Sequence, residues 1–142
     1  MAAAPSTYDD RYLAGIVLFN RHDFFEAHEV WEDLWKSYSG DLRLFYKGLI
    51  QAAVALHHFG NGNIRGARKV YFTSRNYLEQ YRPFCRGLDL ETFLGQFDAC
   101  FAQVAACQEE FPRIDLDPAL IPEIALDPPV ELPLVDIEQA DS

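Results

Sequence analysis

The sequence has few cysteines, few basic residues and no long apolar run. The cysteines number three, Cys85, Cys100 and Cys107, without paired short spacings. This pattern argues against a disulfide framework or a zinc knuckle and favours a reducing, cytoplasmic compartment. Lys and Arg total 12 against 22 Asp and Glu, and the net charge of -10 disfavours non-specific binding to nucleic acid or anionic lipid. Because no run is long enough to span a bilayer, we expect no membrane partner.

Recognisable catalytic signatures are also missing. There is no His-Glu-x-x-His motif, no serine or threonine lies in a nucleophile elbow, and no cysteine has a neighbouring histidine. The loop Gly60-Asn61-Gly62-Asn63 is short and follows no strand, which indicates helix capping rather than phosphate binding. The enzyme class that stays open is an acid–base or metal-dependent hydrolase.

Helical periodicity runs through the first 111 residues. The five expected helices span residues 8–19, 23–38, 41–59, 63–82 and 89–111. No alternation of apolar and polar residues indicates a strand before the tail. We therefore predict an all-α domain over residues 1–111, with short connections that favour antiparallel neighbours.

The third helix, about residues 41–60, is apolar or small at nearly every position. Such a helix needs neighbours on all sides, so we predict that it is central. At about 100° per residue, Lys47, Gln51 and His58 fall in one stripe, whereas His57 points elsewhere. A buried polar group without a partner costs about 1–3 kcal/mol, so a polar partner should face this stripe.

The second helix supplies candidate partners beside its apolar face. A polar cluster between these two helices would contain His28, Glu29, Glu32, Gln51 and His58. We favour a structural, hydrogen-bonded cluster in a binding or interaction module, with Gln51 and Lys47 as candidate ligand-binding residues. At least one side chain of the second helix should then hydrogen-bond Gln51 or His58, directly or through water.

The alternative is a metal- or acid–base-dependent hydrolase that uses the same cluster. The candidate catalytic residues are His28, Glu29, Glu32 and His58, and the candidate ligands of a divalent metal are His28, Glu32 and His58. A carboxylate beside a histidine in a half-buried cleft can have its pKa shifted towards neutrality, as general acid–base catalysis requires. A metal is not favoured, because carboxylate-rich bundles take ligands from facing helices and the third helix offers no carboxylate.

The fourth helix is basic. Its cations and the one that follows Pro83 are Arg65, Arg68, Lys69, Arg75, Arg82 and Arg86. They could bind phosphate or RNA, with Phe72 and nearby tyrosines as stacking surfaces. The favoured interpretation is that they face acidic residues of the second helix or the tail. We predict no strong nucleic-acid binding, because the whole chain is anionic.

Residues 112–142 form a proline-rich acidic tail. They hold eight acids, one base and six of the eight prolines. Proline disfavours a helix and favours an extended chain. The many aliphatic residues predict that the tail docks, either on its own domain or on another protein. The chain could therefore be a homo-oligomer or bind a partner protein through this tail.

Three sequence blocks resemble a known family. They are FFEAHEVWEDLW (24–35), KGLIQAAVALHH (47–58) and GNIRGA (62–67). These blocks resemble the domain-of-unknown-function family numbered 309, and the likeness extends more loosely to Phe111 but not into the tail. The resemblance implies a small all-helical fold in which one helix is surrounded by the others. It implies no activity, so no catalytic or metal-binding residue is carried over from it.

Overall fold

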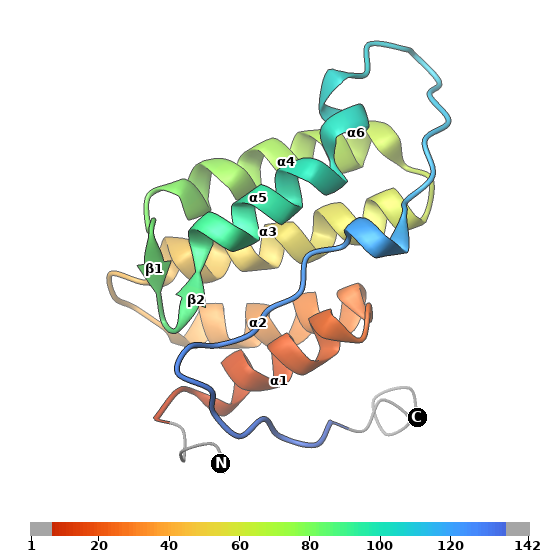
Figure 1. Cartoon of the computed structure of the whole chain (residues 1–142). Helices are drawn as coiled ribbons and strands as arrows, with labels where there is room; N and C mark the ends of the chain where they lie inside the picture. Colours follow the sequence, from red (N-terminus) through yellow and green to blue (C-terminus); the bar gives the residue numbers. More distant parts are fainter. Residues whose placement is uncertain (1–6, 136–142) are drawn as a thin grey trace.

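The computed structural model describes residues 7–135 of the chain (Figure 1). The helices are α1 (Asp10–Asn20), α2 (Phe24–Ser37), α3 (Arg43–Gly60), α4 (Ile64–Glu79), α5 (Leu90–Cys100) and α6 (Ala102–Ala106). The short elements are β1 (Phe84–Cys85), β2 (Leu88–Asp89) and the 3-10 helix η1 (Pro118–Leu120). The predicted all-α class is confirmed. No helix within residues 7–135 has the length and apolar character needed to cross a membrane.

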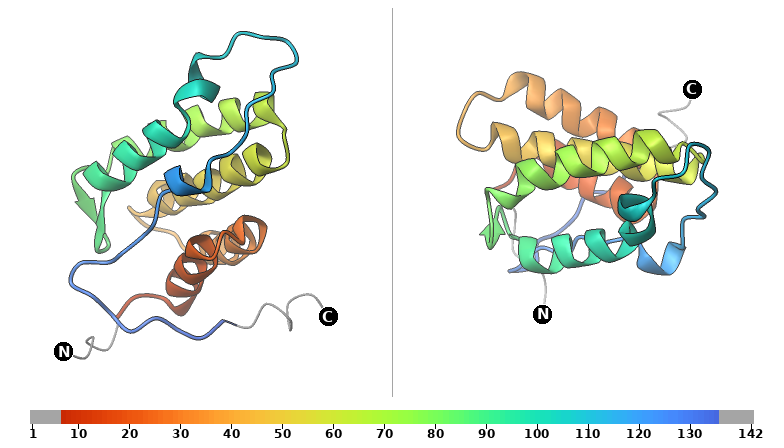
Figure 2. Two further views of the ribbon diagram at one scale, coloured as in Figure 1. Left: turned by 45° about the vertical axis from the view of Figure 1, so that its right-hand side comes forward. Right: turned by 90° about the horizontal axis from the view of Figure 1, so that it is seen from above.

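Consecutive helices pack on one another, so that α3 lies between α2 and α4 (Figures 1 and 2). Helix α1 also contacts α5, because the ring centroids of Phe19 in α1 and Phe93 in α5 are 6.0 Å apart. Trp31 of α2 is wholly buried, and its Nε1 donates to the carbonyl oxygen of Tyr12 at 3.1 Å. This core contains many aromatic residues, and each buried ring removes a large apolar area from water.

The central helix α3 is closely packed on most of its circumference. Ala52 and Ala53 are wholly buried. Gly48 lets α4 approach, because a Cβ atom at this position would lie 2.7 Å from the Leu78 side chain. The Ser74 hydroxyl also donates to the Gly48 carbonyl at 2.7 Å. One stripe nevertheless reaches the surface, and it consists of Leu44, Lys47, Gln51, Val54 and His58. The central position of the helix is thus confirmed, with one side open to solvent.

The fifth predicted helix is divided in two. The chain bends at Phe101, and α6 ends at Ala106 instead of continuing to Phe111. The Phe101 ring is buried, with its centroid 4.8 Å from that of Tyr71 and 5.2 Å from that of Phe59. Apolar periodicity continues through this bend, so it does not distinguish one helix from two.

A small hairpin precedes α5, contrary to the expectation of no strand. β1 and β2 pair antiparallel. Arg86 and Gly87 join them with φ angles of 49° and 79°, as in a type I′ turn. The Tyr12 hydroxyl donates to the Arg86 carbonyl at 2.9 Å, which ties the hairpin to α1. Strands of two residues are too short to give an alternation signal, which explains why the sequence pattern misses them.

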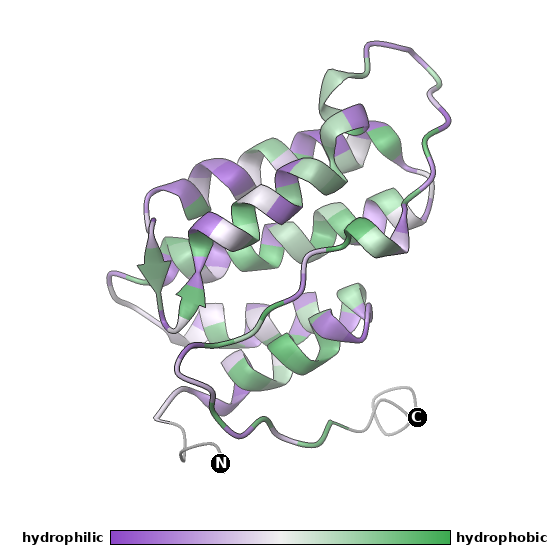
Figure 3. Ribbon diagram, in the orientation of Figure 1, coloured by the Kyte–Doolittle hydropathy of each residue, from purple (hydrophilic) through white to green (hydrophobic). Residues whose placement is uncertain are grey.

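The tail packs on the helices of its own chain. It returns from α6 through η1 towards α1 (Figure 1), and hydrophobic and hydrophilic residues alternate along it (Figure 3). Ile124 and Leu126 are buried. The Asp127 amide donates to the Gly87 carbonyl at 2.9 Å, so this segment also contacts the hairpin. The rest of the predicted tail, residues 136–142, lies outside the described residues.

Candidate functional site

The α2 part of the predicted polar cluster is a pair within one helix. His28 Nε2 lies 2.9 Å from Glu32 Oε2, and His28 Nδ1 lies 3.3 Å from the Phe25 carbonyl oxygen. Glu29 is exposed and lines an open hollow of about 390 Å³ with His28 and Glu32. The spacing of four residues places His28 and Glu32 on the same helix face, so this pair forms without any contribution from α3.

The candidate residues of α3 lie apart from that pair. His58 Nδ1 lies 3.3 Å from Asn63 Nδ2, at the start of α4. Lys47 Nζ lies 4.5 Å from the ring centroid of Trp35, in a cation–π contact. Gln51 is half-exposed. In the described part of the chain, no α2 side chain hydrogen-bonds Gln51 or His58 directly, so the direct form of the expected bridge is absent there.

The expected direct contacts with α2 do not form because one side of α3 is open to solvent. Lys47, Gln51 and His58 belong to the stripe that reaches the surface, where water can satisfy their polar atoms. The histidine that meets α2 is His57, whose ring centroid is 5.5 Å from that of Phe25. Partial burial lowers the pKa of His58, and the neighbouring His57 lowers this pKa further, so His58 favours its neutral form.

Within residues 7–135 no group of three His, Cys, Asp or Glu side chains is arranged to hold a metal ion. Of the predicted metal ligands, His28 and Glu32 lie together, whereas His58 lies beside Asn63. Zinc sites use three or four protein ligands, and calcium needs more. Of the candidate catalytic residues, His28, Glu29 and Glu32 line one hollow, whereas His58 lies apart from them.

The arginines in the C-terminal half of α4 and in the turn that follows it are paired with acids. Arg75 Nε lies 2.8 Å from Asp98 Oδ1, and Arg82 Nη2 lies 2.6 Å from Glu91 Oε2. Glu79 of α4 contacts both arginines as well. The expectation that these arginines face α2 or the tail is wrong, because α5 packs along this side of α4.

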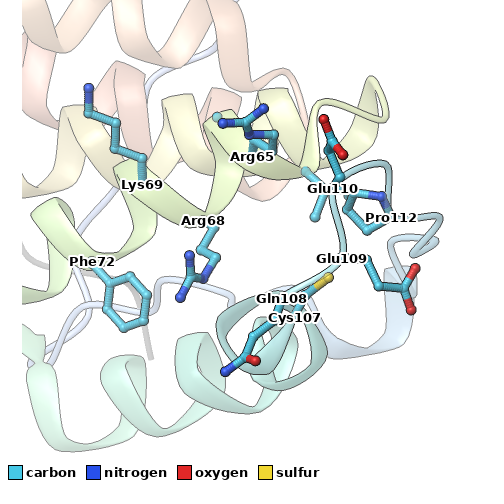
Figure 4. A pocket seen from close by; sticks show the side chains of 11 residues that line it. Arg65, Arg68, Lys69, Phe72, Cys107, Gln108, Glu109, Glu110 and Pro112 are labelled. Carbon is cyan, nitrogen blue, oxygen red and sulfur yellow. The ribbon is translucent and has the colours of Figure 1, made fainter.

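The N-terminal half of α4 carries cations of a different kind. Arg65, Arg68, Lys69 and Phe72 share one helix face, because they are spaced as i, i+3, i+4 and i+7. This face and the segment 107–112 surround an open cavity of about 840 Å³ (Figure 4). Neither Arg65 nor Lys69 forms an ion pair within the described chain, and Phe72 is 42% exposed.

Arg68 is held in place at this cavity. Its Nε donates to the Ala105 carbonyl of α6 at 3.3 Å, and its guanidinium carbon lies 5.7 Å from the Phe72 ring centroid. The opposite wall carries Glu109 and Glu110, and Glu109 points away from the α4 cations (Figure 4). The sequence predicts the basic face of α4 but not this wall. The apolar periodicity predicts that the fifth helix continues to Phe111, so residues 107–110 are expected to be helical.

The position of these cations on α4 is electrostatically unfavourable for the helix itself. They lie in its first two turns, where the helix dipole is positive, and the first turn contains no acid. Asn63 caps the helix by accepting a hydrogen bond from the Gly66 amide at 3.0 Å. A cation near a helix N-terminus opposes the dipole by about 0.3–1 kcal/mol, and a bound anion would offset that repulsion.

Residues 12–70 match the model of the family described as Domain of unknown function (DUF309). This part of the chain is similar to the DUF309 family. The predicted resemblance is therefore confirmed. The DUF309 match begins in α1 and ends within α4, so it contains Arg65, Arg68 and Lys69 but neither Phe72 nor the segment 107–112.

Two curated relatives of this chain carry names without an activity. An "Uncharacterized protein" of Aquifex aeolicus (strain VF5) is 40% identical over 92 residues, which cover 64% of this chain and 26% of that protein. The "Uncharacterized protein YpuF" of Bacillus subtilis (strain 168) is 35% identical over 86 residues, which cover 59% of this chain and 49% of that protein. The chain thus spans about a quarter and about half of these relatives, and neither name carries an activity.

Proposed function

We propose that this chain is a binding module that holds an anionic group in the α4 cavity. The observation that carries the proposal is a contrast between the start of α4 and the segment made of its C-terminal half and the turn after it. Arg75 and Arg82 are paired with carboxylates of α5, whereas Arg65 and Lys69 have no ion pair in the described chain and border an open cavity. An anion between them would gain from both charges and from the positive end of the helix.

The carboxylates on the opposite wall limit the charge of the ligand. Glu109 and Glu110 line the same cavity as the three cations Arg65, Arg68 and Lys69, so the net formal charge around it is small. A polyanion would meet both carboxylates, whereas a ligand with one compact anionic group could avoid them. A phosphate or carboxylate group fits this requirement, because a guanidinium can bind either one through two parallel hydrogen bonds.

A titration of the full chain with inorganic phosphate and pyrophosphate, followed by amide NMR, tests this proposal. We expect saturable shifts in residues 64–72 and 107–112. The double variant Arg65→Gln, Lys69→Gln should weaken binding by about tenfold or more, which corresponds to about 1.4 kcal/mol. Lys36→Gln on α2 is the matched control and should bind as the wild type does. Binding that is insensitive to the double variant, or absent at millimolar concentrations, would refute the proposal.

The other functional assignments from the sequence stay predictions. An acid–base hydrolase would use His28, Glu29, Glu32 and His58, of which His28 Nε2 and Glu32 Oε2 lie 2.9 Å apart beside an open hollow. Homo-oligomerisation, binding of a partner protein through the tail, and a cytoplasmic location also stay predictions. Gel filtration with light scattering, at two protein concentrations, tests homo-oligomerisation directly.

A further inference from the structure

Resting on the proposed function, we propose that the anion is the phosphate of a free nucleotide whose base lies on Phe72 and Arg68. Inorganic phosphate would use only the cations of the cavity. The same cavity also contains an aromatic ring that is 42% exposed, on the helix face that carries those cations. A ligand that joins a phosphate to a flat ring would use both features. The volume of about 840 Å³ lies within the usual range for small-molecule sites.

The spacing along α4 sets the order of the two parts of the ligand. Arg65 lies at the N-terminal end of the helix and Phe72 is seven residues further on. At about 1.5 Å per residue they are about 10 Å apart along the helix axis. The ribose of a nucleotide separates its phosphate from its base in the same way. The phosphate would therefore contact Arg65 and Lys69, and the base would reach Phe72.

Arg68 supplies the second flat surface. The hydrogen bond from its Nε to the Ala105 carbonyl fixes the guanidinium near the Phe72 ring. A base stacks on an aromatic ring and on a guanidinium plane regardless of its identity. Gln108 on the opposite wall carries an amide that can donate to and accept from the edge of a base. The site should therefore bind nucleotides of more than one base, with differences between bases set by Gln108.

The distinguishing experiment compares three ligands on the full chain by calorimetry: pyrophosphate, ribose 5-phosphate and adenosine 5′-monophosphate. We expect the nucleotide to bind about tenfold or more tightly than ribose 5-phosphate, because stacking adds to the phosphate contact. Phe72→Leu should remove that difference while leaving the binding of ribose 5-phosphate unchanged. Phe84→Leu is the matched control, since Phe84 is similarly exposed but lies on β1.

The two levels of the proposal fail in different ways. If the nucleotide and ribose 5-phosphate bind equally, or if Phe72→Leu leaves the difference intact, the nucleotide is ruled out and the anion site stands. If none of the three ligands binds, or if Arg65→Gln and Lys69→Gln leave all affinities unchanged, the anion site is ruled out as well. Far-ultraviolet circular dichroism of each variant verifies that the helical fold is retained.

Discussion

The side-chain amide of Asn20 forms both of its hydrogen bonds with the backbone of Ile124. Asn20 Nδ2 donates to the Ile124 carbonyl at 2.8 Å, and the Ile124 amide donates to Asn20 Oδ1 at 2.9 Å. Asn20 is the last residue of α1, and the Ile124 side chain is buried. One residue at a helix end therefore satisfies two backbone groups of the tail and fixes an apolar side chain over the core.

Asn20→Ala should release this part of the tail. The substitution leaves a buried donor and a buried acceptor without their partners, which costs about 1–3 kcal/mol. We expect a lower midpoint of chemical denaturation, together with faster amide exchange in residues 120–127. Asn76→Ala on the exposed face of α4 is the control and should change stability by less than about 0.5 kcal/mol. Equal effects of the two substitutions would contradict the role assigned to Asn20.

A second prediction concerns the packing of α3. Ala52 and Ala53 are wholly buried, so Ala52→Leu and Ala53→Leu should each overpack the core and cost about 1–3 kcal/mol. Gln51→Leu on the same helix is the control. Gln51 is partly exposed, so the leucine side chain can extend towards solvent there. Thermal unfolding followed by circular dichroism measures all three. Unchanged curves for both alanine variants would mean that α3 is not tightly enclosed at these positions.

The sequence predicts the helices and the central position of α3 because both follow from the spacing of apolar residues. The spacing of apolar residues does not show whether a polar residue on such a helix faces a buried partner or solvent. Lys47, Gln51 and His58 have the same angular positions whether they face a buried partner or water. The fold decides between these cases, since it leaves one side of α3 uncovered. The predicted polar cluster therefore does not form across the two helices in the described chain.

The tail and the basic helix illustrate a second limit. The aliphatic residues of the tail predict docking, but nothing near Ile124 in the sequence identifies Asn20, which is 104 positions away. The partners of Arg75 and Arg82 are likewise on α5, and only the packing of α5 on α4 brings them together. Composition thus indicates that a segment needs partners, whereas the identity of those partners depends on contacts between distant parts of the chain.

The contact between Arg75 and Asp98 predicts a pH dependence of stability. Burial raises the pKa of Asp98, but hydrogen bonds donated by Arg75 and Tyr71 outweigh burial and hold this pKa below its ordinary value. A carboxylate with a lowered pKa stabilises the fold above about pH 4, and this contribution is lost as the pH falls through the folded-state pKa. Asp98→Asn should therefore flatten the acid side of the stability profile.

The size of this effect is limited by solvent. The Asp98 side chain is 37% exposed, so screening reduces the expected loss at neutral pH to about 1 kcal/mol. Urea denaturation of the wild type and of Asp98→Asn, at a series of pH values from neutral to acid, measures the difference. Asp115→Asn in the tail is the control, since its carboxylate is exposed and forms no ion pair in the described chain. Parallel profiles for the wild type and Asp98→Asn would exclude a stabilising role for this ion pair.

The chain should bind single-stranded RNA only weakly, although α4 is basic. A strand that follows this helix would find Arg75 and Arg82 already paired with carboxylates, and it would meet Glu109 and Glu110 beside the remaining cations. The net charge of -10 adds repulsion over longer distances.

We expect a dissociation constant weaker than about 10⁻⁴ M at physiological ionic strength, measured by fluorescence anisotropy with a labelled strand. Comparing titrations at low and high salt separates the two contributions, because added salt screens the long-range repulsion but leaves the paired arginines unchanged. Tight binding with a steep salt dependence would instead require several free cations along α4, and this would contradict the ion pairs with α5.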